Sequence, residues 1–362
     1  MSEKINIKIL VAPLDWGLGH ATRCIPIITQ LLQLGCKIII AAEGAQEKLL
    51  KTEFPQATFV YLPGYQISYS TNERFFAAKI ILQLPKIYFS IKREHKWLKR
   101  FLTQTPVDAI ISDNRYGFYD DDIPSVFITH QLLIKAPFAA VQNVLQRVNY
   151  SLINRFNQCW VPDQEGKVSL AGVLSHPIRL PQVKVAYLGG LSRLTRSAGC
   201  KKTYDLLIII SGPEPQRTLL EEKMLSQLGL FKGTVLLVRG LPAKEAVIKS
   251  GEKIIIKNHL PAKELEMAFC ESELIISRSG YTTVMDVLKM RKKAVLIPTP
   301  GQTEQEYLAD HLHQQGWCLC MKQEAFSLKE LFDRVSRFNF RIPALDMEAY
   351  KEVVDSFVKE LC

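Results

Sequence analysis

The segment VAPLDWGLGHATRCIPIITQLLQLG, residues 11–35, runs from an apolar strand through a glycine-bracketed turn into an amphipathic helix. Gly17 and Gly19 bracket the turn, and His20 follows directly. A strand that enters a helix in this way is typical of a βαβ unit, and ligands of doubly wound sheets bind beyond the carboxyl ends of the strands. The segment therefore predicts the type of sheet and the edge at which its functional residues lie.

The same alternation of apolar runs and helix-length stretches continues along the chain. DAIISD and SVFITH in the first half, and LLIIIS and AVLIPTP in the second, are nearly continuously apolar, as in parallel strands covered on both faces. A chain of 362 residues also exceeds the usual size of one core. We predict an α/β protein of two Rossmann-like doubly wound parallel-sheet domains that face each other across a cleft. The expected parts are an N-terminal domain over 1–188, a linker over 189–205, a C-terminal domain over 206–344, and a final helix over 345–362 at or near the domain junction.

The charge balance narrows the partners. The formal net charge is +10 and the pI is about 9.1, which favours anionic partners such as phosphates or an anionic membrane surface. Nucleic acid is not expected, because no aromatic platform or binding module accompanies the charge. No apolar run approaches the length of a membrane span and the N-terminus lacks a signal-peptide profile, so we expect the protein in the cytoplasm.

The eight cysteines contain no C-x-x-C pair. We expect them to be buried reduced thiols, and we expect no metal site, because no ligands stand at metal spacing. The acidic triplet at 120–122 is interpreted as solvated turn residues.

Polar residues follow the predicted strands at many of their carboxyl ends. The donor-side candidate is the turn Ser279–Gly280, which opens a helix with Thr282 and Thr283. A helix start offers unpaired N–H groups and a partial positive charge, and Arg278 adds a cation, so we expect a phosphate site there. Asp286 lies one turn further on the same helix face, where its carboxylate suits a ribose diol.

These residues carry a family resemblance. The sequences SRSGYTTVMD and PTPGQTEQEYLA, within residues 274–312, resemble the donor-binding signature of GT-B glycosyltransferases, and the chain is similar to the family 28 group. The turn WGLGH resembles the glycine-rich turn and histidine at the first strand end of that group. Two departures, Asp286 in place of a glutamate and Glu306 in place of a second glutamine, leave the transferred sugar open.

The resemblance implies further roles at the donor site. Arg278 would contact the nucleotide diphosphate, and Gln305 with Glu306 would read hydroxyls of the donor sugar. His259 and Leu260 would contact the base of the nucleotide. The C-terminal domain would therefore bind the nucleotide sugar, and the N-terminal domain would bind the acceptor. The remaining donor-site candidates are Gly17, Gly19, Arg193, Ser211 and Gly212.

His20 is the candidate catalytic base. Glycosyl transfer requires the acceptor hydroxyl to lose its proton, and an imidazole titrates near working pH. Capping of its helix or orientation of the acceptor are the alternatives for His20. Asp113 and His130, which also follow predicted strands, would orient His20 or bind the acceptor.

The segment over 74–102 mixes apolar and basic residues. It fits either a peripheral contact with an anionic membrane, where a lipid-linked acceptor would be found, or an ordinary helix packed on the sheet. A peripheral location on the inner face of the membrane is therefore a second expectation.

The predicted function is an inverting, metal-independent transfer of a hexose or N-acetylhexosamine from a nucleotide sugar, UDP-linked, to a hydroxyl acceptor such as a cell-envelope glycan. No resident cofactor is expected. The alternatives are a non-hydrolysing nucleotide-sugar epimerase on the same fold and a non-catalytic nucleotide-sugar-binding protein.

Overall fold

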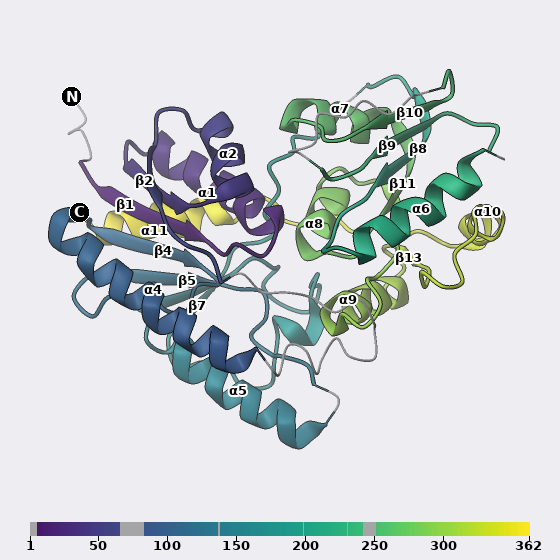
Figure 1. Ribbon diagram of the computed structural model, residues 1–362. Helices are drawn as coiled ribbons and strands as arrows, with labels where there is room; N and C mark the ends of the chain where they lie inside the picture. The colour runs from purple at the N-terminus through teal and green to yellow at the C-terminus, as the bar shows by residue number, and fades with distance from the viewer. Residues whose placement is uncertain (1–5, 66–82, 137, 198, 230, 242–250) are drawn as a thin grey trace. The chain divides into compact units, whose positions relative to one another are not determined.

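A computed structural model describes residues 6–65, 83–136, 138–197, 199–229, 231–241 and 251–362 (Figure 1). These residues form two compact units. The first contains the described residues up to 192 together with 346–362, and the second contains those from 193 to 345. The division falls within the predicted linker.

The first unit is built on a parallel sheet of seven strands in the order β3-β2-β1-β4-β5-β6-β7. Leu10 of the central strand pairs with Ile39 on one side and Ile110 on the other, and all three side chains are buried. The strands are β1 (Lys8–Pro13), β2 (Lys37–Ala42), β3 (Thr58–Tyr61), β4 (Ala109–Asp113), β5 (Ser125–Ile128), β6 (Gln158–Val161) and β7 (Lys184–Tyr187).

The helices of the first unit include one from the far end of the chain. They are α1 (Leu18–Gln33), α2 (Gly44–Glu53), α4 (Leu84–Gln104), α5 (Ala139–Ile153) and α11 (Tyr350–Glu360). Helix α11 packs on the first unit, because Gln30 of α1 donates to Asp355 at 2.6 Å and Phe357 packs edge-on against Trp160. The chain returns to this unit at Asp346, whose carbonyl accepts from Gly190 N–H at 3.1 Å.

The second unit repeats the design with six parallel strands in the order β10-β9-β8-β11-β12-β13. Its strands are β8 (Tyr204–Ile209), β9 (Val235–Val238), β10 (Ile254–Lys257), β11 (Ser272–Ser277), β12 (Lys293–Leu296) and β13 (Leu319–Cys320). Its helices are α6 (Gln216–Leu228), α7 (Ala262–Glu271), α8 (Tyr281–Lys289), α9 (Thr303–Gln314) and α10 (Leu328–Arg337). The predicted pair of parallel-sheet α/β domains is confirmed.

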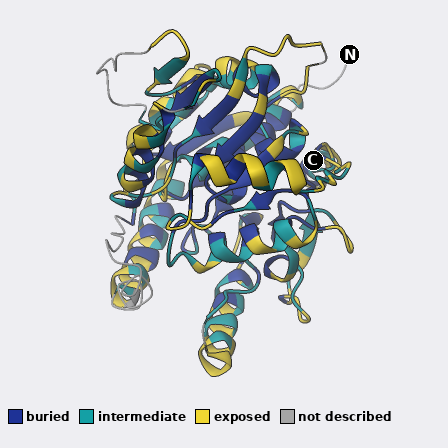
Figure 2. Ribbon diagram, turned by 90° about the vertical axis from the view of Figure 1, so that its right-hand side faces the viewer, coloured by how far each residue is buried: buried dark blue, intermediate teal, exposed yellow. Residues whose placement is uncertain are grey.

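In both units the strand order reverses next to the first strand. The reversal lies between β1 and β4 in the first unit and between β8 and β11 in the second. The connections leave such neighbouring strands in opposite directions, which opens a crevice at the carboxyl edge of the sheet. Most strands are buried, and helices carry the exposed residues (Figure 2).

The expectation that all cysteines are reduced thiols is wrong for one pair. Cys200 and Cys270 form a disulfide within the second unit, with a sequence separation of 70 and a Cα–Cα distance of 5.8 Å. Only the fold brings two such distant positions within bonding reach. The bond ties the segment before β8 to helix α7.

Candidate active site

The turn after β1 is shaped by a glycine that another side chain holds in place. Gly17 has a φ of 81°, in the left-handed region that favours glycine, and it is the N-cap of α1. Gln46 of α2 donates its amide to the carbonyls of Leu14 and Gly17 at 2.5 and 2.7 Å. The turn thereby places His20 in the first turn of α1, with its side chain 15% exposed.

Asp113 and His130 lie beside His20, as the positions of their strands predict. Asp113 is the last residue of β4 and is fully buried, and its Oδ1 lies 3.2 Å from Nδ1 of His20. His130 follows β5 and is also buried. The three candidate catalytic residues therefore meet at the reversal of strand order between β1 and β4.

Arg23 joins these residues, and sequence reasoning missed it. It lies three residues after His20 on α1 and is 2% exposed. Its guanidinium holds both carboxylate oxygens of Asp113, through Nε at 2.7 Å and through Nη2. Its Nη2 also lies 2.9 Å from Nδ1 of His20, and its Nη1 lies 3.2 Å from Nδ1 of His130. We call these four residues the His20 cluster. The spacing of three residues was the available signal, since it places both side chains on one helix face.

The surroundings of His20 and Asp113 favour a neutral imidazole and an ionised carboxylate. Burial lowers the pKa of His20, and the charge of Arg23 lowers it further, while Asp113 acts in the opposite direction. Burial alone would favour the neutral acid of Asp113, but Arg23 and His20 outweigh it and hold the pKa of Asp113 well below its usual value. A neutral imidazole beside an ionised carboxylate has the protonation states that general-base chemistry requires.

In the second unit, Gln305 and Glu306, which are predicted to contact the donor sugar, form hydrogen bonds with neighbouring loops. Gln305 accepts from Thr299 N–H through Oε1 at 3.0 Å, and its own carbonyl accepts from the Ser279 hydroxyl at 2.8 Å. Glu306 accepts from Gly301 N–H at 2.9 Å. These bonds tie the turn before α9 to the turn before α8. A role of Gln305 and Glu306 toward a sugar stays a prediction.

Arg278 holds backbone inside the second unit. Its side chain is fully buried, and its guanidinium donates to the carbonyls of Gln216, Ile297 and Pro298 at 2.7, 3.3 and 3.0 Å. Burial lowers the pKa of Arg278 to about 10. Arg278 thus joins the end of β11 to the start of α6 and to the segment after β12, and its contact with a diphosphate stays a prediction. The sequence does not distinguish an arginine at a strand end that points to a ligand from one that points to backbone carbonyls.

The other donor-side candidates lie at the same edge of the second sheet. Gly280 is the N-cap of α8, which also carries the half-buried Thr282 and Thr283 and the buried Asp286. Ser211 and the exposed Gly212, whose φ is 106°, follow β8. Both turns therefore flank the reversal between β8 and β11.

His259 and Leu260 follow β10, further along the edge. Leu260 is buried, and burial followed by the charge of Arg193 lowers the pKa of His259. Arg193 and His259 are thus neighbours in the second unit.

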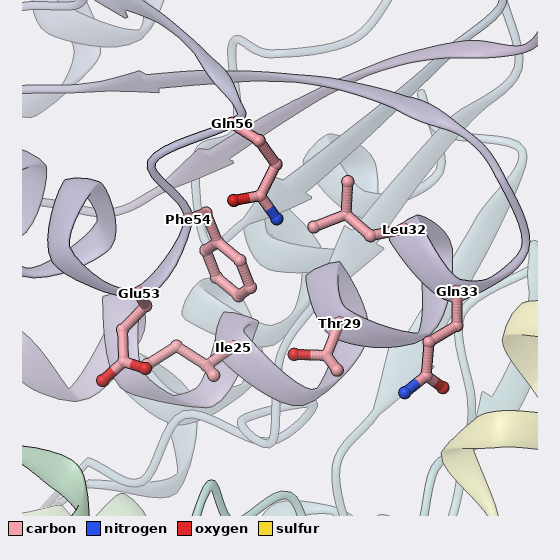
Figure 3. Close-up of a pocket in the computed structure, with 7 residues that line it drawn as sticks. All are labelled: Ile25, Thr29, Leu32, Gln33, Glu53, Phe54 and Gln56. Atoms are coloured by element: carbon pink, nitrogen blue, oxygen red, sulfur yellow. The ribbon is translucent and has the colours of Figure 1, made fainter.

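Two further features lie apart from these edges. A surface pocket of about 410 Å³ lies between α1 and the end of α2, lined by Ile25, Thr29, Leu32, Gln33, Glu53, Phe54 and Gln56 (Figure 3). Helices of this fold run back from the carboxyl edge, so a pocket near their C-termini lies at the opposite, amino edge of the sheet. In the triplet at 120–122, Asp120 pairs with Lys99 at 2.8 Å and accepts from Asp122 N–H, as a turn residue does.

Among the described residues, no three His, Cys, Asp or Glu side chains are grouped to hold a metal ion. Within the same residues, no helix has both the length and the apolar character needed to cross a membrane.

Comparisons with known proteins agree with this architecture. Residues 233–361 match the glycosyltransferase family 28 C-terminal domain. A stretch of 71 residues is 34% identical to UDP-N-acetylglucosamine–N-acetylmuramyl-(pentapeptide) pyrophosphoryl-undecaprenol N-acetylglucosamine transferase of Methylobacterium radiotolerans. That stretch spans 19% of this chain and 19% of the relative.

Solved glycosyltransferases share the fold over almost the whole chain. The structure of MurG from Acinetobacter baumannii is 18% identical with a TM-score of 0.53, covering 98% of this chain and 99% of that one. The spinosyn rhamnosyltransferase SpnG in complex with thymidine diphosphate is 15% identical with a TM-score of 0.64, covering 98% and 96%. The predicted GT-B fold is confirmed, and the family 28 resemblance is confirmed over residues 233–361.

Proposed function

We propose that this chain, a family 28-like protein with the GT-B fold of glycosyltransferases, transfers a hexose or N-acetylhexosamine from a UDP-linked sugar to a hydroxyl acceptor. The proposed reaction inverts the anomeric carbon and needs no metal ion. We assign activation of the acceptor to the first unit and binding of the donor to the second.

The observation that carries the proposal is the contact between His20 and Asp113. Nδ1 of His20 lies 3.2 Å from Oδ1 of Asp113, at the strand edge where α/β sheets bind ligands. With a proton on Nδ1, the neutral ring has its lone pair on Nε2 and accepts the proton of the acceptor hydroxyl there. Asp113 then accepts from Nδ1–H and stabilises the imidazolium, as a carboxylate does for a histidine base.

The bond changes balance without another reactant. As the acceptor proton moves to Nε2 of His20, the acceptor oxygen bonds to the anomeric carbon and the bond from that carbon to the phosphate oxygen breaks. The nucleoside diphosphate leaves with the electron pair. A single displacement inverts the configuration, and donors aimed at the leaving phosphate lower the barrier.

The second unit supplies groups suited to that phosphate. The start of α8 at Gly280 presents backbone N–H groups and the positive end of the helix dipole. Gly212, at φ 106°, has no side chain to block an approach to the turn after β8. Asp286 lies on the same helix, one turn after Thr282, and is proposed as the partner of the ribose hydroxyls.

The acceptor is proposed to be lipid-linked, because one surface of the first unit suits an anionic membrane. Helices α4 and α5 both pack against one apolar cluster, through Ile87 and Leu152. The exposed faces of the two helices, together named here the α4–α5 surface, carry apolar and basic side chains. Its members are Lys86, Tyr88, Phe89, Lys92, Lys96, Val141, Val144 and Val148. The part of the predicted segment over 74–82 lies outside the described residues.

A vesicle assay tests the membrane contact. We expect the protein to co-sediment with phosphatidylglycerol vesicles, to bind phosphatidylcholine vesicles weakly, and to lose binding when Phe89→Ser and Lys92→Glu are combined. Met267→Ser, at an exposed apolar residue of α7, is the control and should bind as wild type. Equal binding of the double variant and wild type would contradict the proposed surface.

A nucleotide-sugar screen tests the transfer itself. We expect UDP-sugars to raise the melting temperature, since a ligand at 100 times its dissociation constant adds about 2.7 kcal/mol. The stabilising donor should then yield an inverted product with a hydroxyl acceptor, in the presence of EDTA, as read by NMR. Turnover of the donor without any acceptor would favour the epimerase, and stabilisation without turnover would favour the non-catalytic protein.

A further inference from the structure

Arg23 is a buried arginine in the middle of the His20 cluster. The residue is 2% exposed, and its carboxylate partner Asp113 is fully buried. The pair is closed by two parallel bonds from Nε and Nη2 to the two oxygens of Asp113. A bidentate pair of this kind fixes the planes of both groups, so Arg23 determines how Asp113 is oriented toward His20.

The chemistry of a guanidinium restricts the histidine that its other nitrogen contacts. A guanidinium has five N–H donors and no acceptor, so any bond it makes to an imidazole needs a lone pair on that ring nitrogen. Nη1 of Arg23 lies 3.2 Å from Nδ1 of His130. The neutral His130 ring must then carry its proton on Nε2, which makes it a hydrogen-bond donor at that atom.

Nδ1 of His20 lies near a donor and an acceptor, which favour opposite tautomers of the ring. Nη2 of Arg23, a donor, lies 2.9 Å from Nδ1 of His20, and Oδ1 of Asp113, an acceptor, lies 3.2 Å from the same atom. A proton on Nδ1 satisfies Asp113 and leaves Nε2 with a lone pair, whereas a proton on Nε2 satisfies Arg23. Only the tautomer selected by Asp113 is able to take a proton from an acceptor hydroxyl at Nε2.

We propose that Arg23 is the positioning residue of the His20 cluster: it orients Asp113 toward His20 and fixes His130 as the Nε2–H tautomer. The inference deepens the proposed function, because it separates the two histidines into a base and a donor. His130 offers an N–H to a substrate oxygen, and His20 accepts the proton. A hydroxyl that donates to Nε2 of His20 adds a bond only to the reactive tautomer, so the acceptor itself selects it.

The charges around the cluster agree with this assignment. The groups that face His20 are Arg23 from its own helix, Asp113 from β4 and His130 from the segment after β5. The thiol of Cys24 donates to Asp113 at 3.5 Å, and burial, with the charge of Asp113, raises the pKa of that thiol, so it stays neutral. The positive charge of Arg23 therefore lies against the negative charge of Asp113, and a second positive charge on His20 is opposed.

Nitrogen-15 NMR of the histidine rings tests the proposal on the full chain without substrate. Signals are assigned with His20→Gln and His130→Gln and followed from pH 5 to 8. In the wild type we expect His130 as the Nε2–H tautomer and the ring of His20 neutral at pH 7. In Arg23→Gln we expect the titration midpoint of His20 to move to higher pH, because a positive neighbour is lost and Asp113 is left unpaired, and we expect His130 to populate both tautomers.

Two further variants separate positioning from folding. Arg23→Lys keeps the charge but replaces the fork by one ammonium, so the midpoint of His20 should fall between those of wild type and Arg23→Gln. Arg217→Gln removes an arginine that is equally buried against Glu221 in the second unit, and it should leave both rings as in wild type. If Arg23→Gln does not fold, Arg23→Lys and the wild-type tautomer of His130 carry the test.

Activity adds a separate readout. We expect Arg23→Gln to lower kcat roughly 100-fold, as loss of alignment does, with the KM for the donor unchanged and partial rescue in Arg23→Lys. A wild-type His130 that carries its proton on Nδ1, or a His20 titration that is the same in Arg23→Gln, overturns the inference. Absence of transfer by the wild type would instead contradict the proposed function and leave the NMR result standing.

Discussion

The two strand-order reversals of this protein share a topology and differ in what they present. At the reversal between β1 and β4, titratable side chains bond to one another: His20, Asp113, Arg23 and His130. At the reversal between β8 and β11, side chains bond to backbone: Arg278 to three carbonyls and Gln305 to an N–H. One edge holds titratable side chains that contact one another, and the other holds side chains that fix the shape of the backbone around them.

This difference fits the roles that we propose for the two units, acceptor activation in the first and donor binding in the second. Proton transfer needs side chains whose charge is set by neighbouring charges, as in the His20 cluster. Binding of a diphosphate needs backbone N–H groups at a rigid helix start. The hydrogen bonds of Ser279, Gln305 and Glu306 hold the backbone around Gly280, where α8 starts. The comparison predicts that substitutions in the first unit change the rate and that substitutions in the second change stability or donor affinity.

The largest expected effect is on catalysis. His20→Gln should lower kcat by about 10²- to 10⁴-fold, the usual contribution of a general base, and should leave the donor-induced rise in melting temperature intact. The measurement is steady-state transfer with the donor found in the screen. His95→Gln is the control, since His95 stacks on Tyr119 away from the cluster. Wild-type kcat in His20→Gln would remove the proposed base.

The next effect is on folding in the second unit. Arg278→Met should lower the free energy of unfolding by about 3 kcal/mol, because three buried carbonyls lose a charged donor. Urea denaturation without ligand measures it. The control Lys263→Met, at an exposed position of α7, should change the value by less than about 0.5 kcal/mol. Full stability of Arg278→Met together with lost donor binding would instead support the phosphate role predicted from sequence.

A smaller effect is expected at the ribose. Asp286→Ala should weaken UDP-sugar binding about tenfold, which removes about 1.4 kcal/mol of ligand-induced stabilisation. Thermal shift with the donor in excess reports this loss. Asp333→Ala, at an exposed position of α10, serves as the matched control. The same shift in Asp286→Ala and wild type would rule out the ribose contact.

The smallest effect is on the pH dependence. Because the pKa of His20 is lowered, the ring stays neutral to lower pH than an ordinary histidine, so the acid limb of kcat against pH should lie below pH 6.5. Activity is lost as pH falls through that limb, since protonation removes the lone pair of Nε2. A limb above pH 6.5 would show that Asp113 outweighs burial and Arg23.

Much of the fold and part of the site could be predicted from sequence. Apolar runs such as residues 109–112 show buried parallel strands, and the residues that follow strands show the functional edge. His20, Asp113 and His130 were found in this way. Arg23 was not, because an arginine inside an amphipathic helix is normally assigned to its solvated face, and its spacing from His20 acquires meaning only when β4 and β5 are placed.

Two further features could not be predicted from the sequence: the direction of the Arg278 side chain and the disulfide. The sequence places Arg278 at a strand end, but whether a long side chain points outward or back into the unit depends on the carbonyls that surround it. Cys200 and Cys270 are 70 residues apart, and no spacing rule connects them.

The sequence by itself determined the pair of parallel sheets and the edges at which chemistry lies, because hydrophobic periodicity and turn glycines are local properties of the chain. The tertiary structure alone decided which charges are paired. Pairing depends on distances of about 3 Å between residues as far apart in sequence as Arg23 and Asp113, and in a buried site those distances set the protonation states.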